Sequence, residues 1–260
     1  MNEFDYKKSF GQNFIKDDNI IHKIVKYSNI DKDTVVIEIG PGAGSLSKEI
    51  VPLSSYALLY EIDTRLNDIL SNVLSGNDNY EIIFGDFLEQ DISDLHERFS
   101  NKKIYVVANL PYYITTPIIT KLLDEVYPDR IIVMVQREVA LRLSSKYGSR
   151  DYGMISVLLG SRYDIKKIFD VNRNCFVPIP NVDSAVICLD KNNKLGNTNV
   201  ELFENLIKCA FQFKRKNLKN NLKGYDLDKI NDILVSYGYS LSNRAEEIPV
   251  EVFIEIAKNL

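Results

Sequence analysis

The sequence predicts an α/β fold in which a mostly parallel sheet is covered by helices, followed by a small all-helical domain. Short apolar runs alternate with helical patterns from residue 34 onward, which is typical of such a sheet. Residues 190–199 are polar and contain Asn-Asn and Gly-Asn pairs, which are typical of a linker. Beyond them the apolar spacing has a period of 3.6. We therefore expect one domain over residues 1–190 and a helical domain over 191–260.

The predicted strands are six short apolar runs bounded by polar or turn-forming residues. Runs of five or six residues fit the usual length of a buried strand. The runs lie at 34–39, 56–60, 80–84, 103–108, 130–135 and 184–189, and the last is expected to close the sheet.

The clearest predicted helix of the first domain follows the fourth apolar run. Thr115 or Thr116 can serve as N-cap, Pro117 suits the first turn, and the apolar residues that follow share one face. The C-terminal domain shows three helical patterns, namely an apolar stripe over 203–211, a second helix at 227–237 and a third opened by Pro249.

Composition narrows the class of protein. The chain has 260 residues, of which 45% are hydrophobic and 26% charged, which fits a soluble globular protein. Its three cysteines form no C-x-x-C pair, so we expect neither a metal site nor a disulfide framework, and a reducing cytoplasm is the expected compartment. Neither a signal peptide nor an apolar run of membrane-spanning length is found, so no membrane partner is expected.

The net charge of −4 argues mildly against a nucleic-acid partner, but the charges are unevenly distributed. Residues 137–167 carry seven basic and three acidic side chains, and residues 201–223 carry six basic and two acidic ones. Either segment can be an ordinary solvated helix face or a phosphate-binding surface.

A glycine-rich turn follows the first predicted strand, at Gly40-Pro41-Gly42-Ala43-Gly44. Glycines at a strand-to-helix junction let the backbone approach a ligand and leave helix N-terminal amides free. The spacing G-x-G-x-G departs from the G-x-G-x-x-G of dinucleotide sites, because position 45 is serine. It therefore favours a smaller nucleoside-bearing cofactor and disfavours a nucleotide-dependent oxidoreductase.

Acidic residues stand in or after three successive strands. Glu61 is 21 residues beyond Gly40, where a carboxylate can accept both hydroxyls of a ribose. Asp86 can accept a hydrogen bond from an adenine amine while Phe87 covers the adenine ring. The Glu38 side chain can point toward a cationic centre. Each acid alone can equally be a helix cap or a solvated loop residue. Together they favour an S-adenosylmethionine pocket.

The run at 103–108 leads into Asn109-Leu110-Pro111-Tyr112. The exocyclic amine of a base is a poor nucleophile, so a site that alkylates it must offer acceptors nearby. The side-chain oxygen of Asn109 and the carbonyl of Leu110 or Pro111 are such acceptors. Tyr112 can stack on the base, although the four residues can also be a plain turn that closes a strand.

The chain resembles the ribosomal RNA adenine N6-dimethyltransferase family along its whole length, and within it the small-subunit branch. The resemblance rests on six motifs in order. These are Lys8-Ser9-Phe10-Gly11-Gln12-Asn13-Phe14, Glu38-Ile39-Gly40-Pro41-Gly42, Glu61-Ile62-Asp63, Gly85-Asp86, Asn109-Leu110-Pro111-Tyr112, and Phe176-Val177-Pro178-Ile179-Pro180 with Val182-Asp183-Ser184.

The resemblance implies a Rossmann-like class I S-adenosylmethionine-dependent methyltransferase. It implies methylation of N6 on two adjacent adenines, in a hairpin loop near the 3′ end of small-subunit 16S rRNA, during ribosome biogenesis. Tyr112 and Phe176 would sandwich the adenine. The prolines next to Phe176 suggest that this residue lies on an exposed, rigid loop. The expected partner is the immature small subunit, and the expected state is a monomer. The implied cofactor contacts are Asn13, Ile15, Gly40, Glu61, Asp86 and Asn109, to which the glycine turn and strand ends add Glu38, Gly42 and Phe87.

The chain departs from the family pattern at Asn181, where lysine is usual, and it is slightly short at its C-terminal end. Two alternative functions remain. One alternative is an Erm-type large-subunit rRNA methyltransferase, and the other is a largely non-catalytic assembly or nucleic-acid-binding factor. The residues expected to contact RNA phosphates are the cations Arg137, Arg142, Lys146, Arg150, Lys208, Lys214, Arg215, Lys216, Lys219 and Lys223.

Overall fold

The computed structural model describes residues 13–260, which divide into two compact units. The first contains the chain up to Ala140 together with Lys167–Leu189, and the second contains Leu141–Lys166 and Asp190–Leu260. The long segment of the second unit begins at Asp190, whereas the sequence predicts a helical domain over 191–260. Residues 141–166 join that segment.

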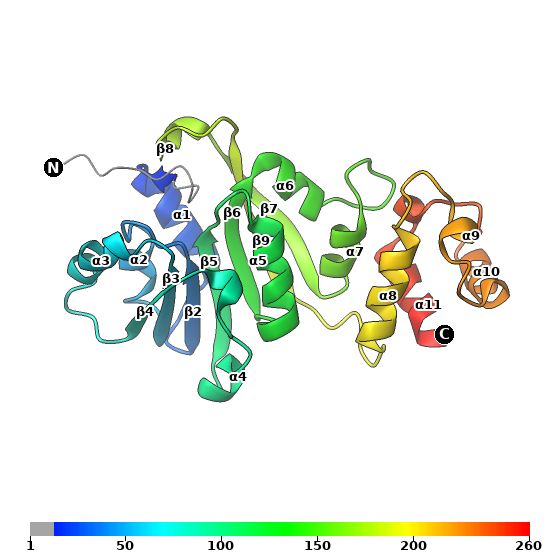
Figure 1. The fold of residues 1–260 in the computed structure, drawn as a ribbon, viewed down its shortest axis with the longest axis horizontal. Helices are drawn as coiled ribbons and strands as arrows, with labels where there is room; N and C mark the ends of the chain where they lie inside the picture. The colour runs from blue at the N-terminus through cyan, green and yellow to red at the C-terminus, as the bar shows by residue number, and fades with distance from the viewer. Residues whose placement is uncertain (1–12) are drawn as a thin grey trace. The chain divides into compact units, whose positions relative to one another are not determined.

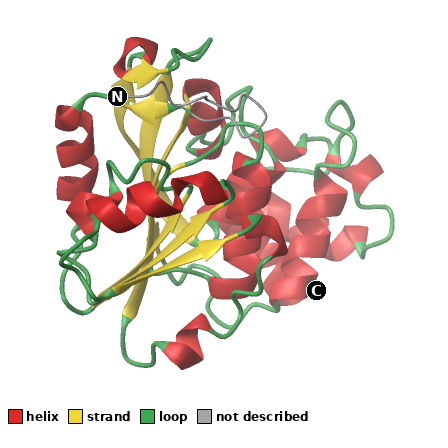
Figure 2. Ribbon diagram, turned by 60° about the vertical axis from the view of Figure 1, so that its left-hand side comes forward, coloured by secondary structure: helices red, strands yellow, loops and turns green. Residues whose placement is uncertain are grey.

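A seven-stranded sheet has the order β4-β3-β2-β5-β6-β9-β7 (Figure 1). The pairs β2–β3, β3–β4, β2–β5 and β5–β6 are parallel, and Figure 2 shows the strands as a twisted layer. The backbone N–H of Asn192 donates to the carbonyl of Arg162, which joins the end of β9 to the start of β7 and makes that pair antiparallel. The strands are β2 (Thr34–Ile39), β3 (Tyr56–Glu61), β4 (Tyr80–Phe84), β5 (Lys103–Asn109), β6 (Arg130–Gln136), β7 (Tyr163–Val171) and β9 (Ser184–Lys191).

All six predicted strands are present, two with the predicted bounds and four extended by one or two residues. The strand of this sheet that was missed from the sequence is β7. Its sequence, YDIKKIFDV, has charged residues within it, and most of its positions are exposed or half-buried because it lies at the edge of the sheet. A sequence search for continuous apolar runs cannot detect such a strand.

A second, two-stranded sheet joins β1 (Phe14–Ile15) to β8 (Phe176–Val177). The strands are antiparallel, and Ile15 pairs with Phe176. This pairing brings the beginning of the described chain to the segment that precedes β9.

Seven α-helices precede β7 in the described chain, and the last of them belongs to the second unit. One of them, α1, packs Ile20, Ile21 and Ile24 against side chains of β2, β5, β6 and β9. The predicted helix after Asn109 is present as α5, although Ile114, not a threonine, is its N-cap. The seven are α1 (Asp18–Ser28), α2 (Ser47–Ile50), α3 (Asn67–Val73), α4 (Leu95–Arg98), α5 (Thr115–Lys121), α6 (Arg137–Leu143) and α7 (Met154–Gly160).

The helices of the second unit surround a core of their own, in which Phe203 and Phe253 are fully buried. Three of them match the predicted patterns: α8 (Val200–Ala210), α10 (Leu227–Ser236) and α11 (Val250–Asn259). The short α9 (Leu218–Asn221) was not predicted, because a single turn leaves little periodicity to detect.

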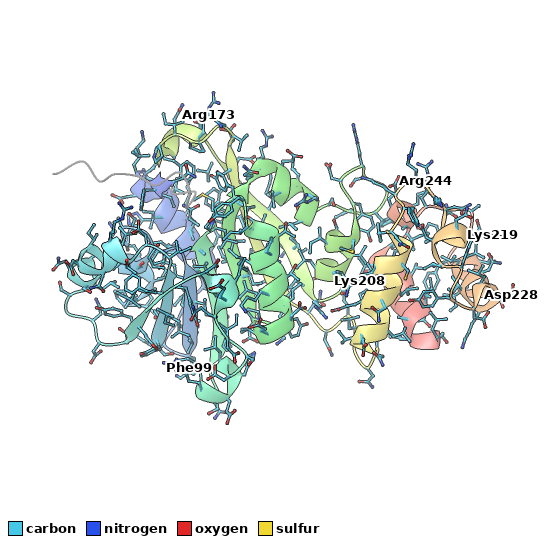
Figure 3. All side chains as sticks on the ribbon, viewed as in Figure 1. Phe99, Arg173, Lys208, Lys219, Asp228 and Arg244 are labelled. Carbon is cyan, nitrogen blue, oxygen red and sulfur yellow. The ribbon has the colours of Figure 1, made fainter. Side chains whose placement is uncertain are left out.

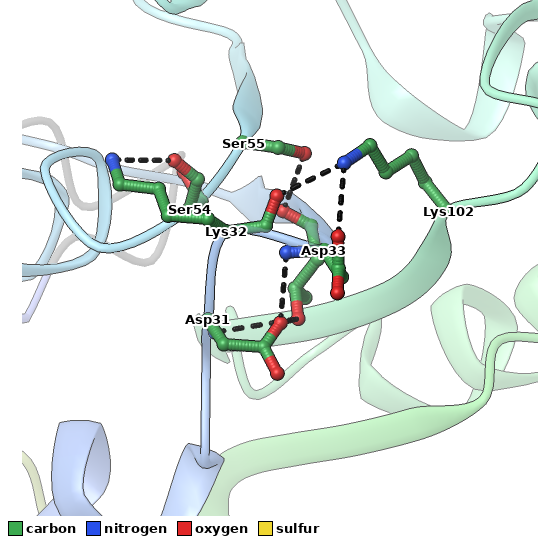
Figure 4. Close-up of polar contacts among 7 residues, drawn as sticks. Asp31, Lys32, Asp33, Ser54, Ser55 and Lys102 are labelled. Carbon is green, nitrogen blue, oxygen red and sulfur yellow. Dashed lines mark hydrogen bonds and ion pairs between the residues drawn. The ribbon is translucent and has the colours of Figure 1, made fainter.

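A polar network fixes the starts of β2 and β5, at the amino ends of the strands (Figure 4). The Asp31 carboxylate accepts from the Thr34 hydroxyl at 2.7 Å and from the Asp33 amide at 3.0 Å. Lys102 donates to the Asp33 carboxylate at 3.2 Å. These bonds lower the pKa of Asp31, chiefly through the Thr34 hydroxyl. The network is structural and lies at the end of the sheet opposite to Gly40 and Asn109.

Within residues 13–260, no helix is long and apolar enough to cross a membrane. The same residues contain no group of three or more His, Cys, Asp or Glu side chains that could hold a metal ion.

Candidate active site

A cavity opens at the carboxyl ends of β2, β3 and β5. The chain runs outward from β2 to β4 on one side and continues from β5 on the other, so β2 and β5 flank the point where the strand order reverses. Open α/β sheets bind ligands at such points. The lining residues are Asn13, Phe14, Ile15, Glu38, Gly40, Pro41, Gly42, Ser45, Leu46, Glu61, Ile62, Asn109, Leu110, Pro111 and Tyr112.

The glycine turn forms one wall of this cavity. Gly40 and Gly42 have φ of +72° and +59°, which glycine adopts without strain. A Cβ on Gly42 would lie 2.5 Å from Cε1 of Phe14, so the missing side chain makes room for that ring. The remaining space is about 80 Å³, less than the roughly 300 Å³ of an ordinary ligand site. The Phe14 ring therefore fills part of the volume that a nucleoside would need.

The Glu61 carboxylate lies at the end of β3 and ties two backbone segments together. Its oxygens accept from the amides of Gly42 and Asp63, each at 2.9 Å. Burial raises the pKa of Glu61, and the two amide bonds act in the opposite direction. Glu61 lines the cavity, and each oxygen of an ionised carboxylate can accept a second hydrogen bond, so the side chain suits a donor pair such as the two hydroxyls of a ribose.

Glu38 is the second buried carboxyl of the cavity, with 2% of its surface exposed. Its Oε2 accepts from the Ser47 hydroxyl at 2.6 Å. Burial raises the pKa of Glu38 to about 8, and the nearby charge of Glu61 adds to the rise. At neutral pH the side chain is therefore mostly protonated, and a cation that entered the cavity would favour its ionised form.

The Asn109 amide is held in one orientation. Its Nδ2 donates to the Asn13 carbonyl at 2.9 Å. Its Oδ1 is buried and accepts no hydrogen bond from any described residue. A buried amide oxygen without a donor is costly, so the site fits a ligand that brings an N–H to this point.

The rest of the Asn-Leu-Pro-Tyr motif is also fixed by hydrogen bonds. The Pro111 carbonyl accepts from the Ile114 amide at 3.3 Å and from the Thr115 hydroxyl at 3.1 Å. These bonds make the Leu110 carbonyl the better candidate for a second acceptor. The Tyr112 hydroxyl lies 2.5 Å from that of Ser184, the first residue of β9. This bond holds the half-buried Tyr112 ring in place, and burial raises the pKa of Tyr112.

The expectation that Phe176 lies on an exposed loop is wrong. Its side chain is fully buried in a core with α1, because the β1–β8 pairing places it beside Ile15. The most exposed apolar residue of this segment is Ile179, which is 57% exposed. Prolines favour a rigid segment, but they do not tell which side chain faces solvent.

Asp86 and Phe87 do not line the cavity. The Asp86 carboxylate caps the short 3₁₀-helix Phe87–Glu89 by accepting from the Leu88 amide at 2.9 Å. Phe87 is 4% exposed and packs edge-on against Tyr60, with ring centroids 5.1 Å apart. In this arrangement the Phe87 ring is covered by protein.

Sequence reasoning missed several residues of the site. Phe14 and Ile62 line the cavity, and Ser184 positions Tyr112. Ile62 is 38% exposed, and the sequence signals it only by its position directly after Glu61 at a predicted strand end. Residues 8–12 of the first motif lie outside the described residues.

The ten cations expected to contact RNA are all exposed. Arg137 is the one that belongs to the first unit, where it pairs with Asp170 at 3.6 Å. In the second unit, Lys208 on α8 pairs with Glu204 at 3.7 Å, and Lys219 lies on α9 (Figure 3). Exposure is what a phosphate-binding role requires, and it is equally compatible with solvated helix faces.

The sequence matches known proteins over almost its full length. A model of the ribosomal RNA adenine dimethylase family matches residues 3–260. The Bacillus mycoides (strain KBAB4) protein named ribosomal RNA small subunit methyltransferase A is 39% identical, with 99% of this chain and 92% of the relative aligned. The Bacillus cereus (strain B4264) protein of the same name is 38% identical with the same coverage.

Two solved structures have a similar fold. A dimethyladenosine transferase from Plasmodium falciparum superposes with a TM-score of 0.80 at 24% identity, covering 94% of this chain and 95% of that one. The 23S rRNA methyltransferase ErmE superposes with a TM-score of 0.78 at 25% identity, covering 95% and 99%. These similarities confirm the predicted Rossmann-like methyltransferase fold.

Proposed function

Since the chain belongs to the ribosomal RNA adenine dimethylase family, we propose that it dimethylates N6 of two adjacent adenines in a hairpin loop near the 3′ end of small-subunit 16S rRNA. The names of its curated relatives support the small subunit as the substrate. The proposed partner is the immature small subunit, met by a monomer in the cytoplasm. Residues 1–190 would carry the chemistry and residues 191–260 would contribute rRNA recognition.

The proposal depends on one observation above all, the buried Oδ1 of Asn109 that has no donor among the described residues. An adenine amine placed there would donate to Asn109 and to the Leu110 carbonyl. Two acceptors in this position hold the amine and direct its lone pair toward the methyl group. Orientation of this kind supplies much of the catalysis, and the chemistry requires no metal.

S-adenosylmethionine is the methyl donor, and its sulfonium makes the methyl group strongly electrophilic. The proposed holders of this cofactor are the backbone around Gly40 and Gly42, the Glu61 carboxylate for the ribose, and Glu38 near the positive charge. Asn13 and Ile15 would cover it from the β1 segment. For the cofactor to enter, the ring of Phe14 must move from the glycine turn, because it fills part of the cavity.

Tyr112 is the proposed stacking partner of the target adenine. Its hydroxyl is bound to Ser184, so its ring meets the base without losing further rotational freedom. Phe176 can form the second side of the sandwich only if it leaves the core. The target base must itself be unpaired or extruded, because the cavity cannot reach into an A-form helix.

The Erm-type alternative shares this chemistry and differs in its substrate. The fold does not separate the two, because the TM-scores to the dimethyladenosine transferase and to ErmE are 0.80 and 0.78. The non-catalytic alternative is disfavoured by the cavity, because a binding factor has no need for an orphaned amide oxygen beside two buried carboxyls.

The test uses small and large ribosomal subunits, in separate reactions, from a strain that lacks the enzyme, together with tritiated S-adenosylmethionine. Wild-type protein should label 16S rRNA and create primer-extension stops at two adjacent adenines, because a dimethylated base blocks the polymerase. Asn109→Ala should abolish both signals, while the control Asn193→Ala, in the exposed linker, should retain them. Labelling of large-subunit rRNA instead would favour the Erm-type alternative, and wild-type labelling by Asn109→Ala would refute the role of the amide.

A further inference from the structure

The loop between α8 and α9, residues 212–216, borders a groove of about 530 Å³ on the second unit. Its sequence is Gln-Phe-Lys-Arg-Lys, and all five side chains are exposed. The three cations lie in a row without an acidic residue among them, so the loop carries a local charge of +3. Such a charge attracts a phosphate backbone.

Phe213 is the unusual residue of this loop, because its ring is 49% exposed next to three cations. The Nζ of Lys216 lies 4.5 Å from the ring centroid, which is a cation–π distance. The ammonium can contact the ring from one side, which leaves the other side available to a planar group. An exposed ring beside cations is the combination that single-stranded nucleic acids bind.

The loop is held by hydrogen bonds and not only by its ends. Asn221 Nδ2 donates to the Ala210 carbonyl at 2.6 Å and to the Phe213 carbonyl at 3.3 Å. The Lys216 amide also donates to the Phe213 carbonyl, at 2.8 Å. The backbone beneath the ring is therefore fixed from two directions. A ring presented in this way loses little conformational freedom on binding.

We propose that Phe213 stacks on an unpaired rRNA base while Lys214, Arg215 and Lys216 contact the neighbouring phosphates. The base is a second contact nucleotide, distinct from the adenine that is methylated, because the methylation cavity is lined by residues of the first unit. The inference rests on the proposed function. It adds Phe213, which a search for basic residues alone overlooks, and it names the chemical group that Phe213 binds.

The test measures the affinity of the full chain for small subunits from a strain without the enzyme. Phe213→Ala should weaken binding about tenfold, which corresponds to about 1.4 kcal/mol and to one stacked base. Phe213→Tyr should bind as the wild type does, because it keeps the aromatic face. Phe213→Leu should lose most of the affinity, since it keeps apolar surface but not a planar ring.

The dependence of affinity on salt separates stacking from charge. Each phosphate contact that is lost lowers the slope of log K against log[salt] by about 0.7 to 0.9. Lys214→Ala should reduce the slope by about that amount, whereas Phe213→Ala should leave it unchanged, because a stacked ring releases no counterions. Tyr237→Ala is the matched control, because that ring is also 49% exposed but does not border the groove.

Three results would overturn the proposal. The first is wild-type affinity of Phe213→Ala, and the second is an equal loss in Tyr237→Ala. The third is a loss of affinity in Phe213→Ala that is seen with intact subunits but not with protein-free 16S rRNA. That result would mean that Phe213 contacts a ribosomal protein. Methylation of the same subunits by wild-type protein is measured in parallel. If methylation occurs and Phe213→Ala binds normally, only the stacking proposal fails; if none occurs, the proposed function fails.

Discussion

Replacing Glu38 with glutamine should remove a pH dependence from cofactor binding. The Glu38 carboxyl lies at the cavity, and burial raises its pKa from an ordinary 4.5 to about 8. At neutral pH it is mostly neutral, and S-adenosylmethionine carries a positive sulfonium. If the sulfonium stabilises the carboxylate, binding of the cofactor releases a proton and therefore strengthens as the pH rises toward 8.

The size of the effect follows from the fraction of Glu38 that is already ionised. With a pKa of about 8, that fraction is roughly 0.03 at about pH 6.5 and roughly 0.9 at about pH 9. The affinity for S-adenosylmethionine should therefore rise about 30-fold across this range, or about 2 kcal/mol. Glutamine can still accept from the Ser47 hydroxyl, so Glu38→Gln keeps the contact and loses the titration.

Isothermal titration calorimetry at a series of pH values measures this difference directly. S-adenosylhomocysteine is the control ligand, because it shares the amino and carboxyl groups of the cofactor but has a neutral sulfur. Its affinity for the wild type should not show the 30-fold rise, and neither ligand should show it with Glu38→Gln. An identical pH profile for S-adenosylmethionine in wild type and Glu38→Gln would refute the reasoning.

Three further outcomes are expected. A raised pKa means that the folded state holds the Glu38 proton more tightly, so the stability that this proton contributes is complete below about pH 4.5 and is lost as the pH rises through about 8. The free energy of unfolding of the wild type, relative to that of Glu38→Gln, should therefore fall by about 5 kcal/mol across that interval. Urea titrations at a series of pH values measure this difference, and parallel stability curves for the two proteins would contradict the prediction. Ser184→Ala removes the hydrogen-bond partner of Tyr112 and should raise KM for the small subunit more than it lowers kcat, whereas an unchanged KM would show that the bond does not position the ring. Phe176→Ala should cost about 3–5 kcal/mol of unfolding free energy, because the side chain is fully buried, and a loss below about 1 kcal/mol would show that the ring spends its time outside the core.

The sequence predicts best where local pattern and final environment agree. The run at 34–39 became a strand with those bounds, because it lies in the interior of the sheet and both of its faces are buried. The run at 80–84 also kept its bounds, although β4 is an edge strand whose residues are half-buried. Glu61 was predicted to face a ligand because the carboxyl ends of parallel strands meet at one edge of a sheet, and the family resemblance added Asn109. Both residues line one cavity.

Prediction fails where contacts between distant segments decide the outcome. Phe176 is buried because a two-residue strand at Phe14 and Ile15 pairs with it, and a strand so short leaves no pattern to read. Ser184 contacts Tyr112 across 72 positions of sequence, so neither residue signals the other. The family resemblance identifies the motifs, but only the structure shows which atoms of those motifs already have hydrogen-bond partners.

The two buried carboxyls give a physical reason for the proposed enzyme to bind its product less tightly than its cofactor. Glu38 and Glu61 both have a raised pKa, because burial disfavours their charged forms. A positive sulfonium offsets that cost, and the offset vanishes at the moment the methyl group leaves and the sulfur becomes neutral. Dimethylation of two adenines consumes four cofactor molecules, so weak retention of the product shortens each cycle. By this reasoning Glu38→Gln should narrow the preference for S-adenosylmethionine over S-adenosylhomocysteine, and a preference that stayed as large as in the wild type would place the sulfonium away from Glu38.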